Sequence, residues 1–359
     1  MAAGLLAGLW AGLVRLGWGL PAGGGLAAAH GPLMVGTVLS SVISLERAVA
    51  LGRPWAYSAP ALAGAGGLAL VAGLSLPVAA GLLAGSSLAL VAVFARLYRL
   101  RPEWASALMS LGAATWLVGN GLWLGGRAIV EVVPWWAAFL VLTIAGERLE
   151  LAQVLVSTRV RGGLSAAAIL ILTGLLLSLP RFLLGVHLVG LGFLALAAWL
   201  ARYDVARRAL HRGGLARFGG VCLLLGYVWL GVAGLLWLLG PEIIEGLWYD
   251  AMVHSLFVGF VFSMIFGHAP TIVPAVTGIG VPFERAFYLH VGLLHGSLLA
   301  RIGGDLTSSS AARDWGGLLN AAALLLFAIL TARAIRRARR AAAVSAPRPP
   351  NRARVSGSP

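Results

Sequence analysis

The chain has 359 residues, of which 60% are hydrophobic and only 11% are charged. A soluble domain carries roughly 25% charged residues, so this composition excludes an ordinary soluble protein and indicates a membrane protein. The net charge of +15 comes entirely from arginine, which lies in short loops and in a tail rather than in a nucleic-acid-binding patch. We therefore expect a lipid bilayer as the partner, and no nucleic acid.

Apolar segments of about 20 residues recur from end to end, and each is long enough to cross a hydrocarbon core of about 30 Å as a helix. They are apolar on all sides, which favours helices over the alternating strands of a barrel. The sequence predicts an all-α fold, a polytopic transmembrane bundle of about twelve helices within residues 1–340, and a disordered Arg/Pro-rich cytoplasmic tail over 341–359. The predicted helices cover residues 4–20, 24–50, 56–75, 77–99, 103–124, 129–157, 164–179, 182–203, 215–239, 247–275, 283–303 and 313–335.

The first segment has no basic stretch before it and no cleavage site after it, so we interpret it as a membrane helix rather than a signal peptide. Its glycines Gly4, Gly8 and Gly12 have the spacing that lets two helices pack closely. The single cysteine, Cys222, lies in an apolar run, which excludes a disulfide and a thiolate metal cage.

The arginines predict the orientation of the chain. The C-terminal segment and the loops after even-numbered predicted helices hold 22 of them, whereas loops after odd-numbered helices hold four. Positively charged loops stay on the cytoplasmic side, so both termini are expected in the cytoplasm and the chain in the cell inner (plasma) membrane. The acidic residues Glu242, Glu245 and Asp250 fall on the outer side.

Two histidines lie at matching predicted depth. His30 and His254 each lie about seven residues, or about 10 Å, from the outer end of their predicted helices. Two neutral imidazoles that face each other across a bundle are the axial ligands of a six-coordinate haem iron, and Gly36 and Gly259 would leave room for a flat macrocycle. The alternative is that each histidine only hydrogen-bonds a neighbouring helix. His187 and His295 lie nearer the outer layer, as further haem ligands or as packing residues.

A second polar site is expected nearer the cytoplasm. His268 precedes Pro270, which removes a helix hydrogen bond and is expected to open this helix toward a polar pocket. Glu147 and His290 can reach a similar depth, and the three side chains could hold copper or another divalent metal. The alternative is a hydrogen-bonded histidine, with the pairs Glu46–Arg47 and Glu147–Arg148 as anchors at the membrane surface.

An internal repeat is a further hypothesis. The segment Ile43–Arg47 resembles Ile144–Arg148, and Ile265–His268 is a looser third copy. The copies are about four predicted helices apart, which fits three four-helix units. Chance similarity among apolar segments is the alternative.

Two stretches carry a family resemblance: Ala29–Gly36, with the sequence AHGPLMVG, and His254–Phe260, continuing to Gly267–Pro270. Through them the chain resembles a distant member of the NnrS family of haem- and copper-containing membrane proteins, related in architecture to the haem-copper oxidase subunit I superfamily. The resemblance implies a b-type haem on His30 and His254 and a link to the nitric oxide response or to respiratory redox metabolism. An electron-transfer partner or a gaseous ligand would then be expected.

The chain departs from the oxidases at the copper site. Glu147 lies where their sixth helix carries a copper-binding histidine, and the sequence has no His-His pair, so oxygen reduction is not expected. Two classes of function remain: a haem-binding membrane protein, and a proton-coupled secondary transporter that uses intramembrane His and Glu. No catalytic triad, P-loop or dinucleotide fingerprint assigns an enzymatic reaction.

Overall fold

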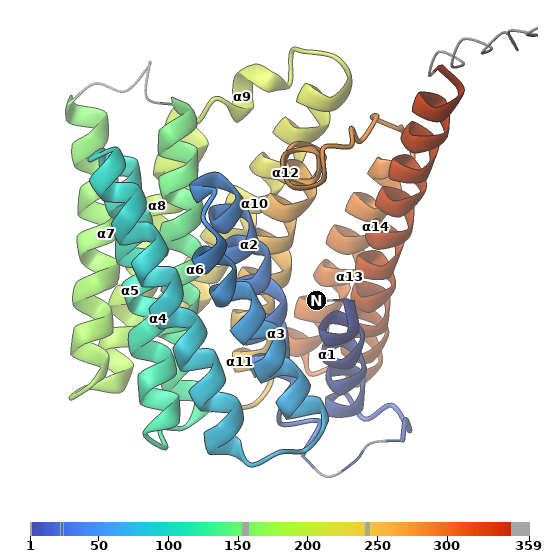
Figure 1. Ribbon diagram of the computed structural model, residues 1–359. Coiled ribbons are helices and arrows are strands. Elements are labelled where there is room, and N and C mark those ends of the chain that lie inside the picture. The colour runs from blue at the N-terminus through green and yellow to red at the C-terminus, as the bar shows by residue number, and fades with distance from the viewer. Residues whose placement is uncertain (1, 22, 24, 153–157, 241–244, 346–359) are drawn as a thin grey trace, which may run out of the picture.

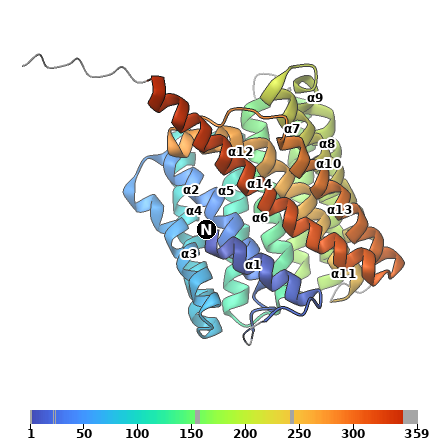
Figure 2. The ribbon, with the colours of Figure 1, turned by 90° about the vertical axis from the view of Figure 1, so that its right-hand side faces the viewer.

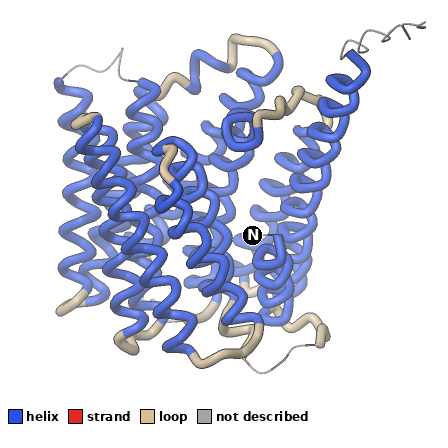
Figure 3. The backbone as a smooth tube through the Cα atoms, in the orientation of Figure 1, coloured by secondary structure: helices blue, strands red, loops and turns tan. Residues whose placement is uncertain are grey.

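The computed structural model describes residues 2–21, 23, 25–152, 158–240 and 245–345 (Figure 1). Within these ranges all regular secondary structure is helical, as Figure 3 shows, so the predicted all-α class is confirmed. The α-helices are α1 (Ala2–Arg15), α2 (Ser40–Leu51), α3 (Ser58–Val71), α4 (Leu76–Leu100), α5 (Trp104–Leu124), α6 (Ile129–Ala152), α7 (Thr158–Ser178), α8 (Phe182–Tyr203), α9 (Ala206–Ala209), α10 (Gly214–Leu239), α11 (Leu247–His254), α12 (Phe262–Thr277), α13 (Phe287–Thr307) and α14 (Ser310–Ser345). Two π-helical segments, η1 (Pro32–Leu39) and η4 (Ser255–Val261), and one 3-10 turn, η2 (Pro54–Tyr57), complete the elements.

Each of the twelve predicted helices has a counterpart. Nine helices in the described ranges are long and apolar enough to cross a membrane. The other three are shorter or more polar: α1 and α3 have 14 residues each, and α13 carries Arg301 and Asp305. Fourteen helical residues span about 21 Å, so α1 and α3 are by themselves shorter than a hydrocarbon core of about 30 Å.

The last helix is longer than predicted. It continues to Ser345 because Ala and Arg, which fill its final turns, are good helix formers. The rest of the predicted disordered tail, 346–359, lies outside the described residues.

Many helices that are consecutive in the chain pack side by side, as α5 with α6, α7 with α8 and α13 with α14 do, and α6 lies in the middle of the bundle (Figure 1). Most of α6 is buried, because it contacts α5, α7, α8 and η4. The turned view in Figure 2 shows α1 beside α3 and α14, at the margin of the bundle. This arrangement brings the beginning of the chain next to its last helix.

The π-helical segments occupy equivalent places in the second and tenth predicted helices. Each follows a histidine, His30 or His254, and each contains a glycine followed four residues later by a serine. In both, the serine hydroxyl donates a hydrogen bond of 2.5 Å to the glycine carbonyl, Ser40 to Gly36 and Ser263 to Gly259. Single π-helical turns occur frequently at functional sites.

The glycines of these segments have a different role from the predicted one. A Cβ on Gly36 would lie 2.9 Å from a methyl carbon of Leu83 in α4, and one on Gly259 would lie 2.5 Å from the Trp229 ring in α10. Both glycines therefore allow close contact with neighbouring helices. The prediction that they leave room for a macrocycle was wrong.

Candidate functional site

The two histidines of the predicted haem site meet in the structure. His254 is the last residue of α11, which begins at Leu247 as predicted, but His30 lies in the first turn of its helix, which begins later than predicted. The described residues between Leu16 and Ala29, most of which were predicted to be helical, lie outside regular helices, and Gly17 and Gly25 both have φ of +87°. His30 follows this segment directly and lies beside His254.

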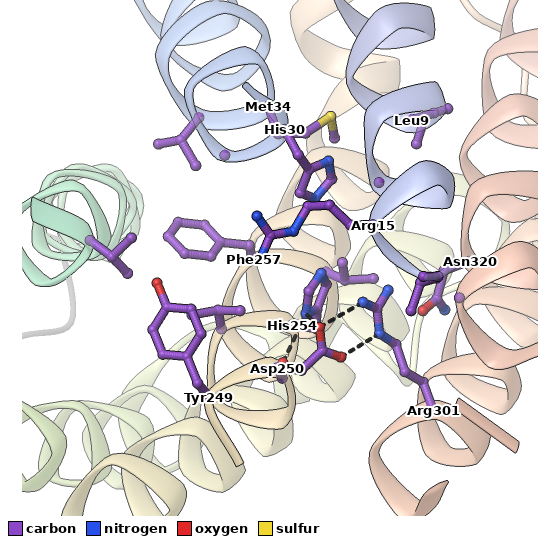
Figure 4. Close-up of a pocket in the computed structure, with 18 of the residues that line it drawn as sticks. Leu9, Arg15, His30, Met34, Tyr249, Asp250, His254, Phe257, Arg301 and Asn320 are labelled. Atoms are coloured by element: carbon purple, nitrogen blue, oxygen red, sulfur yellow. Dashed lines mark hydrogen bonds and ion pairs between the residues drawn. The ribbon is translucent and has the colours of Figure 1, made fainter. Parts of the chain in front are cut away.

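The imidazole rings face each other with nearly parallel planes (Figure 4): their centres are 6.3 Å apart and the planes differ by 20°. His30 Nδ1 lies 2.8 Å from the carbonyl oxygen of Gly8, and His254 Nδ1 lies 2.8 Å from the carbonyl oxygen of Asp250. A carbonyl can only accept, so both Nδ1 atoms carry the proton and donate. Among the described residues nothing bonds to either Nε2, and each keeps a free lone pair.

The separation of the ring centres matches two imidazoles that bind one metal ion, and ligation would further require both Nε2 atoms to point at that ion. With a metal–nitrogen distance of about 2.0–2.1 Å and about 1.1 Å from ring nitrogen to ring centre, the two centres would be about 6–6.5 Å apart. The observed 6.3 Å agrees with this separation. An Nδ1–H bond to a backbone carbonyl is also the usual way in which proteins orient a metal-binding histidine.

The histidines line a cavity of about 610 Å³. Its walls come from α1, η1 and the residues just before it, α6, the segment from α11 to α12, α13 and α14. These walls are mainly apolar, and Met34 and Phe257 lie close to the rings (Figure 4). The size lies within the range of about 300–1,000 Å³ typical of ligand sites. Arg15 lines the cavity as well (Figure 4), and no carboxylate among the described residues pairs with it.

Sequence reasoning missed two charged residues of this cavity. Asp250, predicted to lie in the outer loop, belongs to α11, and Arg301, also counted as a loop residue, is buried within α13. They form a bidentate ion pair, with Arg301 Nε 2.8 Å and Nη2 2.9 Å from the two carboxylate oxygens. The spacing of four residues between Asp250 and His254 was a signal that places both on one helix face.

The other outer histidines do not line the cavity. His295 Nδ1 accepts a hydrogen bond of 2.8 Å from the Trp229 indole, and His187 Nε2 lies 3.0 Å from the carbonyl of Gly240. Both are packing residues in this structure, so the reading of either as an additional haem ligand is not supported.

The predicted inner metal set of His268, Glu147 and His290 is not assembled. Among the described residues no three His, Cys, Asp or Glu side chains gather closely enough to hold a metal ion. The helix continues through Pro270, and both ring nitrogens of His268 are bonded, Nδ1 to the Met264 carbonyl at 2.7 Å and Nε2 to Arg148 at 3.0 Å.

His290 lies in an apolar environment. Its neighbours are the rings of Phe218, Phe266, Phe287 and Phe327, and the Phe266 ring is perpendicular to it with the centres 4.6 Å apart. Neither ring nitrogen has a hydrogen-bond partner in the described part of the chain. An N–H group directed at an aromatic face compensates part of that loss.

The Glu–Arg pairs contact each other across helices. Arg47 binds Glu147 at 2.6 Å as well as Glu46 at 3.0 Å, so the expected Glu46–Arg47 pair forms, whereas Glu147 pairs with Arg47 rather than with Arg148. Arg148 is buried and forms a bidentate ion pair with Asp204 at 2.8 and 2.9 Å. Each of the three segments aligned by the proposed repeat therefore contributes to one polar cluster, through Arg47–Glu147 and Arg148–His268.

The bundle and its cavity define a polytopic helical membrane protein in which two partly buried histidines with nearly parallel rings line a mainly apolar cavity, and neither Nε2 has a hydrogen-bond partner among the described residues. The chain belongs to the family described as a domain of unknown function, DUF8744, whose family model matches residues 1–336. No curated protein and no solved structure matches the chain.

Proposed function

We propose that the chain is a haem-binding integral membrane protein of redox metabolism, with one haem held between His30 and His254. The observation that carries the proposal is the opposed imidazole pair, 6.3 Å between centres, with both Nδ1 atoms fixed by carbonyls. Each ring keeps its Nε2 atom, the nitrogen that a metal requires, without a hydrogen-bond partner in the described part of the chain. The link to nitric oxide or respiratory metabolism rests on the family resemblance of the two histidine segments.

The charges of the cavity support a haem of b type. Such a haem is largely apolar but carries two carboxylates, and these need cations where the site excludes water. Arg15 lines the cavity without a carboxylate partner among the described residues, and Arg313 lines the same cavity from the start of α14. The rings of Trp18 and Trp315, with centres 5.5 Å apart, hold the ends of α1 and α14 together. Arg15 is therefore the residue that would hold one carboxylate, whereas Arg313 would be shared with Asp314, whose carboxylate oxygen lies 3.1 Å from its Nε.

His30 and His254 would hold the haem, and a haem held by two imidazoles would supply one-electron transfer. His30 and His254 are held by backbone carbonyls of different helices, which restrains both rings against rotation. This arrangement favours electron transfer over binding of a gas. Gas binding would require one histidine to release the iron.

The same proposal includes the orientation. With the arginine-rich loops in the cytoplasm, both termini are cytoplasmic and the histidine pair lies in the outer half of the inner membrane. Electrons would then reach the site from the outer side or from within the bilayer.

The test is an absorption spectrum of the full chain, purified in detergent from haem-replete cells. We expect a Soret band and, after reduction, sharp α and β bands typical of two histidine ligands. His30→Ala and His254→Ala should each abolish the low-spin spectrum. His187→Ala is the matched control, because His187 also bonds a backbone carbonyl but lies outside the cavity, and its spectrum should equal that of the wild type.

A colourless wild-type protein would overturn the proposal. A proton-coupled transporter would then be the better reading, and the loss of substrate uptake in Glu147→Gln or His268→Ala would support it.

A further inference from the structure

The two histidines of the cavity have unequal hydrogen-bond partners. His30 Nδ1 donates only to the neutral carbonyl of Gly8, at 2.8 Å. His254 Nδ1 lies 2.8 Å from the carbonyl of Asp250 and also 3.3 Å from the carboxylate oxygen Oδ1 of the same residue. One face of the site is therefore coupled to a carboxylate, and the other face is not.

The position of this carboxylate is fixed. Arg301 contacts both oxygens of Asp250, and Figure 4 shows the carboxylate between the guanidinium and the His254 ring. Arg301 is 7% exposed, so its charge is shielded from solvent. Asp305, one turn along α13, is buried as well, but neither of its oxygens has a hydrogen-bond donor in the described part of the chain. The guanidinium is thus directed at Asp250.

A carboxylate beside the Nδ1–H of a metal-bound histidine increases the electron density at Nε2, which makes the ring a stronger donor to the metal. Its negative charge also stabilises the more positive, oxidised form of the metal, and a low local dielectric strengthens the effect. Arg301 acts in the opposite direction. The reduction potential of a metal between these histidines should therefore depend on the balance between Asp250 and Arg301.

We propose that Asp250 is a positioning residue that orients His254 and lowers the reduction potential of the haem, and that Arg301 fixes Asp250 and limits this lowering. This inference rests on the proposed haem site. It adds that the reduction potential is set by Asp250 of α11 and Arg301 of α13, whereas His30 contacts only the neutral carbonyl of Gly8.

The experiment is a potentiometric titration of the purified, haem-loaded full chain. Asp250→Asn keeps the shape of the side chain and removes its charge, so the midpoint potential should rise by at least about 59 mV. That value equals a tenfold change in the ratio of reduced to oxidised haem for a one-electron couple. Arg301→Gln leaves the carboxylate uncompensated, so the midpoint should move in the opposite direction.

Glu245→Gln is the matched control. Glu245 also lines the cavity and carries one negative charge, but it is exposed, so water and salt should reduce its shift well below tenfold. The double variant Asp250→Asn/Arg301→Gln removes both charges and should return toward the wild-type midpoint.

The outcomes separate the two proposals. A wild-type protein without haem overturns both. A haem-loaded protein in which Asp250→Asn and Glu245→Gln give the same midpoint overturns only the role of Asp250. If Asp250→Asn does not retain haem, Arg301→Gln decides: a lower midpoint supports the inference, and an unchanged or higher one refutes it.

Discussion

The contact between α1 and His30 yields a prediction that separates packing from ligation. A Cβ atom on Gly12 would lie 2.8 Å from Cε1 and 3.0 Å from Nδ1 of His30. Ordinary van der Waals contact begins at 3.4 Å, so Gly12→Ala requires the ring to move by at least 0.6 Å, the difference between 3.4 and 2.8 Å. Helix α1 cannot easily move away, because Gly4 and Gly8 hold it against the same helix. A metal–ligand distance tolerates about 0.2 Å, so the substitution should break His30 ligation.

The assay is the absorption spectrum of Gly12→Ala beside that of Gly4→Ala. Gly4 lies on the same face of α1, but its Cβ would be 3.1 Å from a methyl carbon of Thr37, a deficit that small side-chain movements absorb. We expect Gly12→Ala to lose the low-spin bands but to keep the helical content of the wild type. Gly4→Ala should keep the low-spin bands. A wild-type spectrum from Gly12→Ala would refute the placement of His30 against α1.

Three further predictions follow from charged residues and loops. Arg15→Gln should weaken haem retention during dialysis without changing the band positions, since it removes a carboxylate partner and no axial ligand; retention equal to wild type would exclude this role. Arg148 and Asp204 are 4% and 5% exposed, so Asp204→Leu should lower the free energy of unfolding by about 3–5 kcal/mol because it leaves Arg148 unpaired. The double variant with Arg148→Met should recover part of that stability. Additive losses of stability in thermal unfolding would contradict the buried pair. A cysteine at Gly213 should be shielded from an impermeant thiol reagent in whole cells and one at Ser309 should react; the opposite labelling would invert the proposed orientation.

The number and approximate positions of the membrane helices follow from local information. Hydrophobic length is a property of a contiguous segment, and a helix in lipid satisfies its own backbone hydrogen bonds. This is why segments such as 182–203 and 104–124 agree with prediction within a residue or two. The errors occur where helices end in irregular structure, as at the described residues between Leu16 and Ala29, because turns and tertiary contacts rather than hydropathy decide where a helix ends.

The candidate site was predictable only in part. Counting residues from the outer side placed His30 and His254 at one level, and the structure brings them together. The same reasoning grouped His268 with His290, which the structure leaves apart, because depth says nothing about the direction in which a side chain points around its helix.

The sequence by itself determined that the chain is a helical membrane protein, because composition and the length of apolar segments decide that outcome one segment at a time. It also determined that polar residues within those segments would be few and worth examining. Only the tertiary structure decided which of them meet. Arg301, which was counted as a loop residue, pairs with Asp250, and the carbonyl of Gly8 accepts a hydrogen bond from His30. Such contacts between distant helices depend on packing that no single segment encodes.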